Sequence, residues 1–458
     1  MMGRSSTWIL AAAVGAALLP VSGSAQRART DRHVVLISID GFAADYLVNP
    51  RVPLPNLHRM AEEGAQAEAM MVATPSVTWP NHTTLVTGVY PAKHGVLANG
   101  LIEPATVGPP MAINPRRTKE ELCRFPTVYD LASEAGMVTA EVNWPVTRGA
   151  KTLNYSFPDH PEPLRYTTAA ILDHLKTIWL LPQATDAAFS ALGPVSRDQV
   201  WSQTAAHLIR TRKPNLLMLH LLFTDGIQHR RGPNTDEAYA ALALSDRHVG
   251  DILQALRDAG LRDRSSVVVT ADHGFSRVTR SLQPNVRLHK AGLIRPAEAG
   301  KAAEYDAWTV PEGGTALVYV PKGRLNPELL DQTRRALEEM EGVEKIMPPA
   351  EYTQLGIPER SRNPQAPDFL ISAKDGYAFG GGQTGEEVVQ QVDPTGSHGY
   401  VHTNPKMDGI FVASGAGIRK GVKLQRIKNV DVAPTIARLL GLTVRDVDGR
   451  ALEEILVP

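Results

Sequence analysis

Cysteine is nearly absent from this sequence of 458 residues, since Cys123 is the only one. One cysteine cannot form an internal disulfide, which excludes the small disulfide-stabilised secreted folds. An excess of either charge is also missing, because 48 basic and 48 acidic residues give a formal net charge of zero. General nucleic-acid binders normally carry a basic excess, so we expect no nucleic-acid binding. A small anionic ligand remains possible, because the charge at one site can differ from the total.

Long apolar runs are lacking except at the N-terminus. Arg4 precedes the apolar run Trp8 to Leu19, and Pro20 and a group of small residues follow it. This order predicts a cleaved secretory signal at residues 1–25. The alternative, a retained anchor, fits less well because the run is shorter than the ~20 residues that span a bilayer. We therefore expect a periplasmic or secreted protein with no membrane span after signal removal; the sequence does not indicate its oligomeric state.

Several short apolar runs predict strands buried on both faces of a parallel sheet. Helical patterns lie between them. The predicted strands are 33–39, 138–142, 216–223, 265–270 and 410–413, and the predicted helices are 57–65, 127–135 and 236–259. Alternation of the two predicts an α/β fold with a mostly parallel central sheet flanked by helices.

A region rich in proline and glycine interrupts this alternation. It holds the apolar runs 316–320 and 368–372 and a helical pattern at 327–341. We expect an inserted α+β subdomain at 281–396, with the core formed by 26–280 and 397–458. Residues 101–118 are expected to form a long loop.

Acidic residues follow three of the predicted strands. Asp40 ends the first, Asp225 follows the run 216–223, and Asp272 follows the run 265–270. Sites in open α/β sheets form beyond the carboxyl ends of the strands, so these carboxylates should meet at one edge. Their charges would repel one another unless cations were present. An aspartate after a strand is also a common turn residue, and only the conjunction of three points to a site.

Histidines accompany these acids at spacings that favour zinc. His229 lies four residues after Asp225, His273 is adjacent to Asp272, and His398 lies in a Gly-Ser-His-Gly-Tyr segment. Mixed imidazole and carboxylate ligands suit zinc better than magnesium.

Thr78 lies before an expected helix in the segment Thr74 to Gly88, with Pro80 as an early helical residue. Backbone N–H groups and the helix dipole favour negative charge there. Thr78 could be an ordinary N-cap. Coordination to a metal would instead make its hydroxyl a nucleophile.

Together these segments resemble the alkaline phosphatase superfamily, and most closely its nucleotide pyrophosphatase/phosphodiesterase family. The similarity is carried by motifs spread from Asp40 to the C-terminal part of the chain. They are Ile39-Asp40-Gly41-Phe42, Thr78-Trp79-Pro80-Asn81-His82, Tyr90-Pro91 with His94-Gly95 and Asn99, Asp225 with His229 and Gly232-Pro233, Asp272-His273-Gly274, and His398-Gly399-Tyr400.

The resemblance implies an alkaline-phosphatase-like core and two Zn²⁺ ions. One ion would be held by Asp225, His229 and His398. The other would be held by Asp40, Asp272 and His273, with Thr78 beside it as nucleophile and metal contact. A phospho-threonine intermediate would form, and Asn99 would bind a phosphoryl oxygen. Trp79 is a candidate substrate contact, and the substrate would be a small phosphate ester, for example a nucleotide.

Two departures leave alternatives open. His402 stands where the last motif usually has asparagine, so it competes with His398 as a ligand, although the spacing to Met407 and Phe411 favours His398. Arg148 and Lys151 lie near the segment where some monoesterases carry a Lys-x-Arg pair, so a phosphomonoesterase competes with the favoured diesterase. A phosphonoacetate-type hydrolase and a non-enzymatic periplasmic phosphate-ligand binder are further alternatives.

Overall fold

The computed structural model describes residues 30–458 except 160, 179–180, 182, 296–302 and 384. The export signal predicted at 1–25 lies outside the described residues. Among those that are described, no helix has the length and apolar character needed to cross a bilayer.

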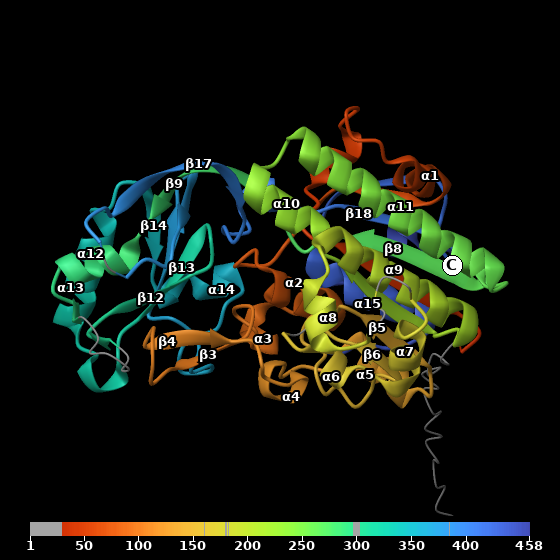
Figure 1. Ribbon diagram of the computed structural model, residues 1–458, viewed down its shortest axis with the longest axis horizontal. Coiled ribbons are helices and arrows are strands. Elements are labelled where there is room, and N and C mark those ends of the chain that lie inside the picture. The colour runs from red at the N-terminus through yellow and green to blue at the C-terminus, as the bar shows by residue number, and fades with distance from the viewer. Residues whose placement is uncertain (1–29, 160, 179–180, 182, 296–302, 384) are drawn as a thin grey trace, which may run out of the picture.

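An eight-stranded sheet forms the centre of the larger lobe, at the right of Figure 1. Its strand order is β19-β2-β18-β8-β1-β7-β5-β6. All neighbours pair in parallel except β18, which runs antiparallel to both β2 and β8. The strands are β1 (His33–Ile39), β2 (Ala65–Met71), β5 (Thr139–Val142), β6 (Tyr155–Phe157), β7 (Leu216–Leu221), β8 (Ser265–Thr270), β18 (Phe411–Gly415) and β19 (Val422–Lys428). The predicted mostly parallel α/β fold is confirmed.

Helices cover both faces of this sheet, because its central strands are apolar on both sides. Every residue of β1, β7 and β8 is buried. One face packs against α1 (Pro55–Glu63), α9 (Pro194–Thr211) and α11 (Asp236–Asp258). The other packs against α2 (Thr78–Thr87), α5 (Val128–Glu134) and α15 (Val432–Leu440).

The segment 281–396 contains antiparallel sheets that lie in the second lobe, at the left of Figure 1. A four-stranded sheet has the order β12-β13-β15-β14. Two helices pack against it, α12 on β12 and α13 on β14. The bounds are α12 (Pro284–Lys290), β12 (Trp308–Pro311), β13 (Thr315–Tyr319), α13 (Pro327–Glu338), β14 (Val343–Met347) and β15 (Phe369–Ala373).

Two strands connect the lobes. The chain leaves the larger lobe along β9 (Ser276–Leu282) and returns along β17 (Val389–Ser397), and these strands pair antiparallel, with Ser276 opposite Ser397. Residues just before β9 and just after β17 therefore lie together, although more than a hundred positions separate them.

The expected loop at 101–118 is wrong in part. Residues Leu101–Pro104 and Met111–Asn114 form the antiparallel hairpin β3–β4, which contacts β12. Two prolines and a glycine between these strands occupy the turn of the hairpin. Such residues are typical of turns, and this composition led to the expectation of a loop.

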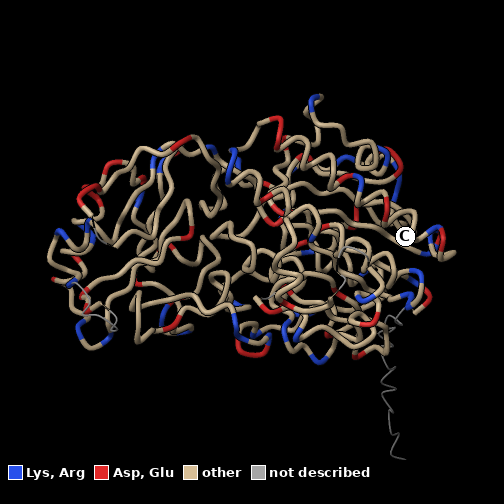
Figure 2. The backbone as a smooth tube through the Cα atoms, viewed as in Figure 1, with Lys and Arg blue, Asp and Glu red and all other residues tan. Residues whose placement is uncertain are grey.

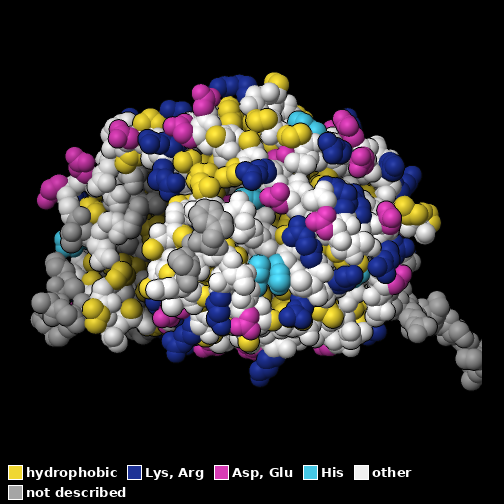
Figure 3. All heavy atoms as spheres, turned by 45° about the vertical axis from the view of Figure 1, so that its right-hand side comes forward, with side chains coloured by type: hydrophobic (Ala, Val, Ile, Leu, Met, Phe, Trp, Pro, Cys, Tyr) yellow, Lys and Arg dark blue, Asp and Glu magenta, His cyan; other side chains and the backbone are white. Residues whose placement is uncertain are grey.

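Charged side chains of both signs are interspersed along the chain and over the surface. The tube in Figure 2 and the face in Figure 3 show basic and acidic residues mixed, without a large area of one sign on that face. This distribution agrees with the net charge of zero.

Candidate metal centre and nucleophile

Each of the three aspartates singled out from the sequence follows a central strand. Asp40 comes after β1 and Asp272 two residues after β8, while Asp225 lies in the first turn of α10 (Phe223–Arg231), which follows β7. Because these parallel strands are neighbours, their carboxyl ends deliver the three side chains to one edge. The sequence argument for a shared location therefore has a direct structural basis.

The carboxylates and histidines form two adjoining groups. In one, Asp40, Asp272 and His273 place a ligand atom each within 4.8 Å of one another; in the other, Asp225, His273 and His398 do so. His273 Nε2 lies 3.3 Å from both Asp40 Oδ1 and Asp272 Oδ2.

His229 completes the second group from α10. Its Nε2 lies 3.2 Å from Asp225 Oδ1, which is also 3.6 Å from His398 Nε2. The ring of His398 stacks on that of His273 with centroids 3.7 Å apart, because the β9–β17 pair brings the two segments together. All six residues that the sequence nominated as metal ligands are thus neighbours.

The tautomers of these histidines follow from their hydrogen bonds. The Nδ1 atoms of His229, His273 and His398 lie 3.1, 3.2 and 2.9 Å from the backbone carbonyls of Gly396, Gly274 and Ser76. A carbonyl only accepts, so each Nδ1 carries the proton and each Nε2 presents a lone pair to the carboxylates. Lone pairs facing carboxylate oxygens repel unless a cation lies between them.

Four buried polar atoms lie at the centre of the cluster without a hydrogen-bond partner in the described part of the chain. Asp40 Oδ1, Asp225 Oδ1, Asp272 Oδ2 and His273 Nε2 have no hydrogen-bond partner among the described residues. Buried polar atoms are normally paired, and a cluster of unpaired oxygen and nitrogen acceptors fits divalent zinc.

Burial dominates the electrostatics of the metal-free site. It raises the pKa of Asp40 and Asp272 well above the ordinary range, and each carboxylate is affected by another one nearby. Burial lowers the pKa of His398 to about 4 and that of His273 well below its ordinary value. His273 and His398 are therefore neutral at neutral pH, which is the state that binds metals. His229 differs: burial disfavours its charged form, but the Asp225 carboxylate outweighs burial and raises the pKa of His229.

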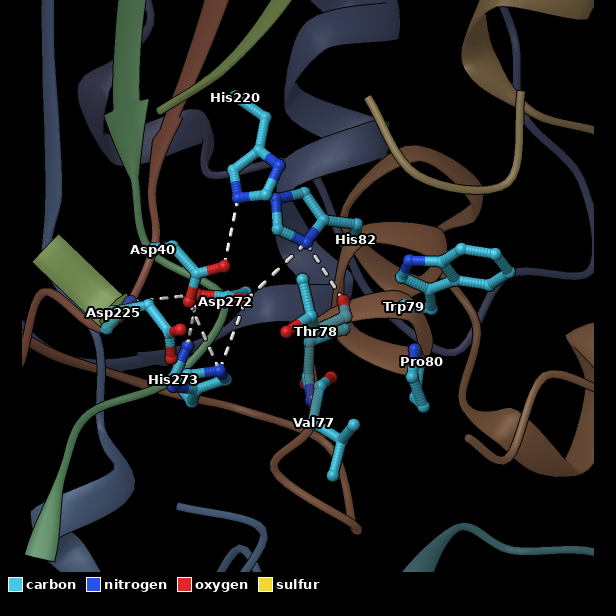
Figure 4. A network of polar contacts seen from close by, with 12 residues as sticks. Asp40, Val77, Thr78, Trp79, Pro80, His82, His220, Asp225, Asp272 and His273 are labelled. Carbon is cyan, nitrogen blue, oxygen red and sulfur yellow. Dashed lines mark hydrogen bonds and ion pairs between the residues drawn. The ribbon is translucent and has the colours of Figure 1, made fainter. Parts of the chain in front are cut away.

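Thr78 lies beside this cluster, as Figure 4 shows. It is the first residue of α2, and the N-cap is Val77. The N-cap interpretation of Thr78 is therefore wrong: its hydroxyl forms no hydrogen bond with a described residue and is not needed to stabilise the helix. The hydroxyl is free for chemistry at the positive end of α2.

Asn99 and Trp79 are linked at the same helix end. Asn99 Oδ1 accepts a hydrogen bond of 2.9 Å from the backbone N–H of Trp79, so the amide nitrogen of Asn99 remains available as a donor. The indole of Trp79 points away from the cluster in Figure 4 and donates to Asp159 Oδ2 at 3.0 Å. Its side chain packs with Val96 and Leu122, and only 6% of the residue is exposed.

His402 takes no part in the cluster. Its Nδ1 lies 2.8 Å from Thr74 Oγ1, and its backbone N–H donates to the same oxygen at 2.9 Å. Arg148 donates to the Tyr166 hydroxyl and lies over that ring at 4.1 Å. Lys151 is exposed.

Two buried histidines next to the site were not assigned a role from the sequence. His220 Nε2 lies 3.0 Å from Asp40 Oδ2, and His82 Nδ1 lies 2.9 Å from the carbonyl oxygen of Thr78. Their rings pack together with centroids 4.3 Å apart. A polar side chain in the middle of the apolar run 216–223 was the available signal for His220, because burial of an imidazole requires a partner.

The known proteins to which this chain is similar are phosphodiesterases and nucleotide pyrophosphatases. A family model described as type I phosphodiesterase / nucleotide pyrophosphatase matches residues 34–401. An uncharacterised pyrophosphatase/phosphodiesterase of Schizosaccharomyces pombe is 26% identical over 444 residues, which cover 91% of this chain and 78% of that protein. The bis(5'-adenosyl)-triphosphatase enpp4 of Xenopus laevis is 24% identical, with 90% and 78% covered.

Solved structures show the same fold. Human ectonucleotide pyrophosphatase/phosphodiesterase 5 superposes with a TM-score of 0.67 at 20% identity, covering 93% of this chain and 100% of that one. The murine counterpart, in an inactive threonine-to-alanine form in complex with AMP, gives the same TM-score of 0.67, identity of 20% and coverages of 93% and 100%.

Proposed function

Because the chain belongs to the type I phosphodiesterase/nucleotide pyrophosphatase family, we propose that it hydrolyses phosphodiester or pyrophosphate bonds with two Zn²⁺ ions and Thr78 as nucleophile. The observation that carries this proposal is the set of unpaired, buried carboxylate oxygens and histidine lone pairs beside a free threonine hydroxyl. The family supports phosphodiesterase or pyrophosphatase activity; the zinc ions and the intermediate are the proposed part.

The residues divide between two ions. Asp225, His229 and His398 would hold one, and Asp40, Asp272 and His273 the other, with Thr78 at the second. Zinc at these positions would supply the positive charge that favours the ionised threonine hydroxyl and offsets charge on the leaving oxygen. The three Nδ1–H···O=C hydrogen bonds would keep the imidazoles aimed at the ions.

Two displacements at phosphorus complete the proposed reaction. Thr78 loses its hydroxyl proton to solvent, and its Oγ1 attacks phosphorus in line. A bond from Thr78 Oγ1 to phosphorus forms, and the leaving oxygen departs with the electron pair of its broken bond and takes a proton from solvent. Water then attacks phosphorus and loses a proton to solvent. The bond between phosphorus and Thr78 Oγ1 breaks with its electron pair on Oγ1, which takes a proton from solvent, and the product phosphate is released.

Donors around Thr78 are suited to the charge that develops on the non-bridging oxygens. Asn99 has a free amide nitrogen because its oxygen is occupied by Trp79 N–H. The backbone N–H of Thr78 would add to it, because among the first N–H groups of α2 that of Trp79 donates to Asn99, that of Asn81 donates to Val77, and Pro80 has none. Asn99 would thus bind the phosphoryl group in both displacements.

The charges near the site favour a diester over a monoester. A monoester dianion carries more negative charge and calls for extra cations. Within the part of the chain that the structure describes, no lysine or arginine forms an ion pair with Asp40, Asp225 or Asp272. Arg148, one of the two cations behind the monoesterase alternative, donates to the Tyr166 hydroxyl and lies over that ring, which supports the preference for a diester.

A nucleotide is the substrate class that we favour. One relative is a bis(5'-adenosyl)-triphosphatase, and one structural neighbour binds AMP. Trp79 stays a proposed substrate contact through its small exposed part. We also propose export to the periplasm or beyond, from the signal predicted at residues 1–25.

The proposal is tested with zinc-loaded protein on a panel of substrates. We expect turnover of bis-nitrophenyl phosphate and of a dinucleoside polyphosphate to exceed that of nitrophenyl phosphate and phosphonoacetate. Faster turnover of the monoester or the phosphonate would select the corresponding alternative, and no turnover of any substrate by the zinc-loaded chain would support the non-enzymatic binder.

Variants separate the nucleophile from the ligands. Thr78→Ala should abolish turnover while both zinc ions stay bound, whereas Thr78→Ser should keep part of the activity. His398→Ala should lose one zinc equivalent and His402→Ala none, as measured by elemental analysis. Unchanged activity of Thr78→Ala would remove Thr78 from the mechanism.

A further inference from the structure

His220 is a polar residue in the middle of an apolar buried strand. It belongs to β7, where all six residues are buried, and 0% of it is exposed. Its neighbours Leu219 and Leu221 pack into the core. Burial of an imidazole costs free energy unless hydrogen bonds replace water, so its partners indicate why it is there.

The principal partner is one oxygen of Asp40. His220 Nε2 donates to Asp40 Oδ2 over 3.0 Å, and both side chains are fully buried. The other oxygen, Asp40 Oδ1, has no hydrogen-bond partner and lies 3.3 Å from His273 Nε2 inside the candidate metal centre. Figure 4 shows His220 on the side of Asp40 opposite His273. The two oxygens of this carboxylate thus have separate environments.

His220 is itself held from behind by Asn143. Its Nδ1 lies 3.1 Å from the Asn143 backbone oxygen and 3.3 Å from the nitrogen of the Asn143 side-chain amide, which can donate to it and so leaves the ring proton on Nε2, facing Asp40. The same amide nitrogen lies 3.2 Å from the His220 carbonyl oxygen. Asn143 is 1% exposed and has a φ of 59°, which non-glycine residues rarely adopt. Such backbone strain persists only where surrounding contacts enforce it.

The same segment is fixed by further contacts. The backbone N–H of Trp144 donates to the buried carboxyl of Glu141 at 3.0 Å, and the Trp144 ring lies edge-on to His82 with centroids 4.8 Å apart. Val146, a β-branched residue, also has a positive φ of 60°. A strained turn after β5 therefore holds the imidazole of His220 in place, and His220 in turn contacts Asp40.

We propose that His220 is a positioning residue that occupies Asp40 Oδ2 and so leaves Oδ1 alone to face a zinc ion. This inference rests on the proposed function, because Asp40 is a ligand only if the centre binds metal. A carboxylate restricted to one oxygen leaves a coordination position open, which a catalytic zinc needs. Residues that orient ligands in this way typically contribute 10–100-fold to metal affinity or activity.

The experiment compares zinc binding by four variants. His220→Leu removes the hydrogen bond. His220→Gln can place an amide nitrogen near the position of Nε2, and His220→Asn is too short to do so. His248→Leu is the matched control, because His248 is also buried, with 1% exposed, but lies on α11, and its one ion pair among the described residues is with Asp251, at 3.7 Å. Zinc affinity is measured by competition with a chromophoric chelator, and kcat and KM with bis-nitrophenyl phosphate.

We expect His220→Leu and His220→Asn to bind one of the two zinc equivalents about 10–100-fold more weakly and to lose kcat rather than raise KM. His220→Gln should recover most of both properties, and His248→Leu should match the wild type. Wild-type zinc affinity in folded His220→Leu would overturn the proposal. If that variant fails to fold, equal zinc binding by the Gln and Asn variants would overturn it instead. Failure of the proposed function is distinct, since the wild type itself would then bind no zinc or show no turnover.

Discussion

A hydrogen bond to a backbone N–H sets the orientation of the Asn99 amide. The N–H of Trp79 donates to Asn99 Oδ1, so the oxygen of the Asn99 amide faces the start of α2. The two N–H bonds of the same amide therefore point away from the Trp79 N–H. Asn99 is therefore pre-oriented as a donor before any substrate arrives, and no reorganisation is needed when charge develops.

This orientation leads to a prediction for Asn99. Asn99→Ala should lower kcat by ~10²-fold, since removal of a comparable donor in other enzymes has an effect of that size. Asn99→Asp keeps the acceptor for Trp79 N–H but loses the donor, so its kcat should fall at least as far. Steady-state kinetics and zinc analysis measure both; an active Asn99→Asp with normal zinc content would show that the donor is unimportant.

Glu312 is a buried carboxyl group whose effect on stability should depend on pH. Its side-chain Oε1 is buried and has no hydrogen-bond partner among the described residues, and burial raises the pKa of Glu312 to about 8. The folded state therefore keeps the proton that the unfolded state releases near pH 4.5. The stability that depends on this group is present below pH 4.5 and is lost as the pH rises toward 8.

We expect Glu312→Gln to be close to the wild type in stability at pH 5 and more stable at pH 8.5. The difference should amount to roughly 1.4 kcal/mol for each unit of the pKa shift. Denaturant unfolding at the two pH values measures it, and the comparison of variant with wild type cancels the groups common to both. A difference that is independent of pH would contradict the assigned pKa direction.

Among the elements, α10 depends on a carboxylate from another helix. Asp198 of α9 accepts from the backbone N–H groups of Leu222 and Phe223, at 3.0 and 3.2 Å, where α10 begins. The N-cap residue Leu222 cannot do this with its own side chain. Asp198 thus fixes the start of the helix that carries Asp225 and His229.

Asp198→Ala should reduce stability by about 1–2 kcal/mol, as loss of a cap does, and weaken binding of the zinc held by α10. Asp236→Ala is the control: Asp236 lies in the first turn of α11 but is exposed and paired only with exposed Arg51, so little change is expected. Thermal unfolding with and without zinc measures both. Equal effects of the two substitutions would contradict a special role for Asp198.

Elements with strong local patterns were predictable from the sequence, and an element that depends on distant partners was not. The apolar runs gave β1 and β8 with their observed bounds, and α11 to within one residue. No prediction was made for β2, whose sequence AQAEAMM contains no β-branched residue. It forms because β18 and β19 pair with it from the far end of the chain, which local propensity does not encode.

The candidate site shows the same limit. The six ligands and Thr78 were nominated because each follows a strand or a motif, but Asp40 and His220 are separated by 180 positions and meet only in the folded sheet. The register of β1 against β7, with Ser38 opposite His220, decides that contact. Sequence patterns therefore nominated the carboxylates and histidines that the structure brings together, but not His220, which contacts one of them.

On the scale of the whole molecule, the cluster of buried carboxylates and histidines is a local source of instability unless a cation is bound. Several buried acceptors there have no partner among the described residues. Burial, and then the charge of a neighbouring carboxylate, raises the pKa of Asp40 (through Asp225) and of Asp272 (through Asp40). Ligands that bind only the folded state stabilise it by mass action.

Removal of metal should consequently lower the unfolding temperature and abolish turnover, and zinc should restore both. At a hundred times the dissociation constant, binding contributes about 2.7 kcal/mol. Differential scanning fluorimetry with chelator, zinc or magnesium measures the effect, and Thr78→Ala should respond to zinc much as the wild type does. Identical unfolding temperatures with chelator and with zinc would argue against a metal centre.

The pairing of β9 with β17 has a consequence for synthesis of the chain. His273 precedes the segment between these strands and His398 follows it, so the two stacked rings meet only after more than a hundred intervening residues have been made. A growing polypeptide thus carries Asp40, Thr78, Asp225 and His273 for a long time without His398, the last of the proposed ligands. We expect zinc capture to be among the final events of maturation, so that an incomplete chain cannot act on cellular phosphate esters.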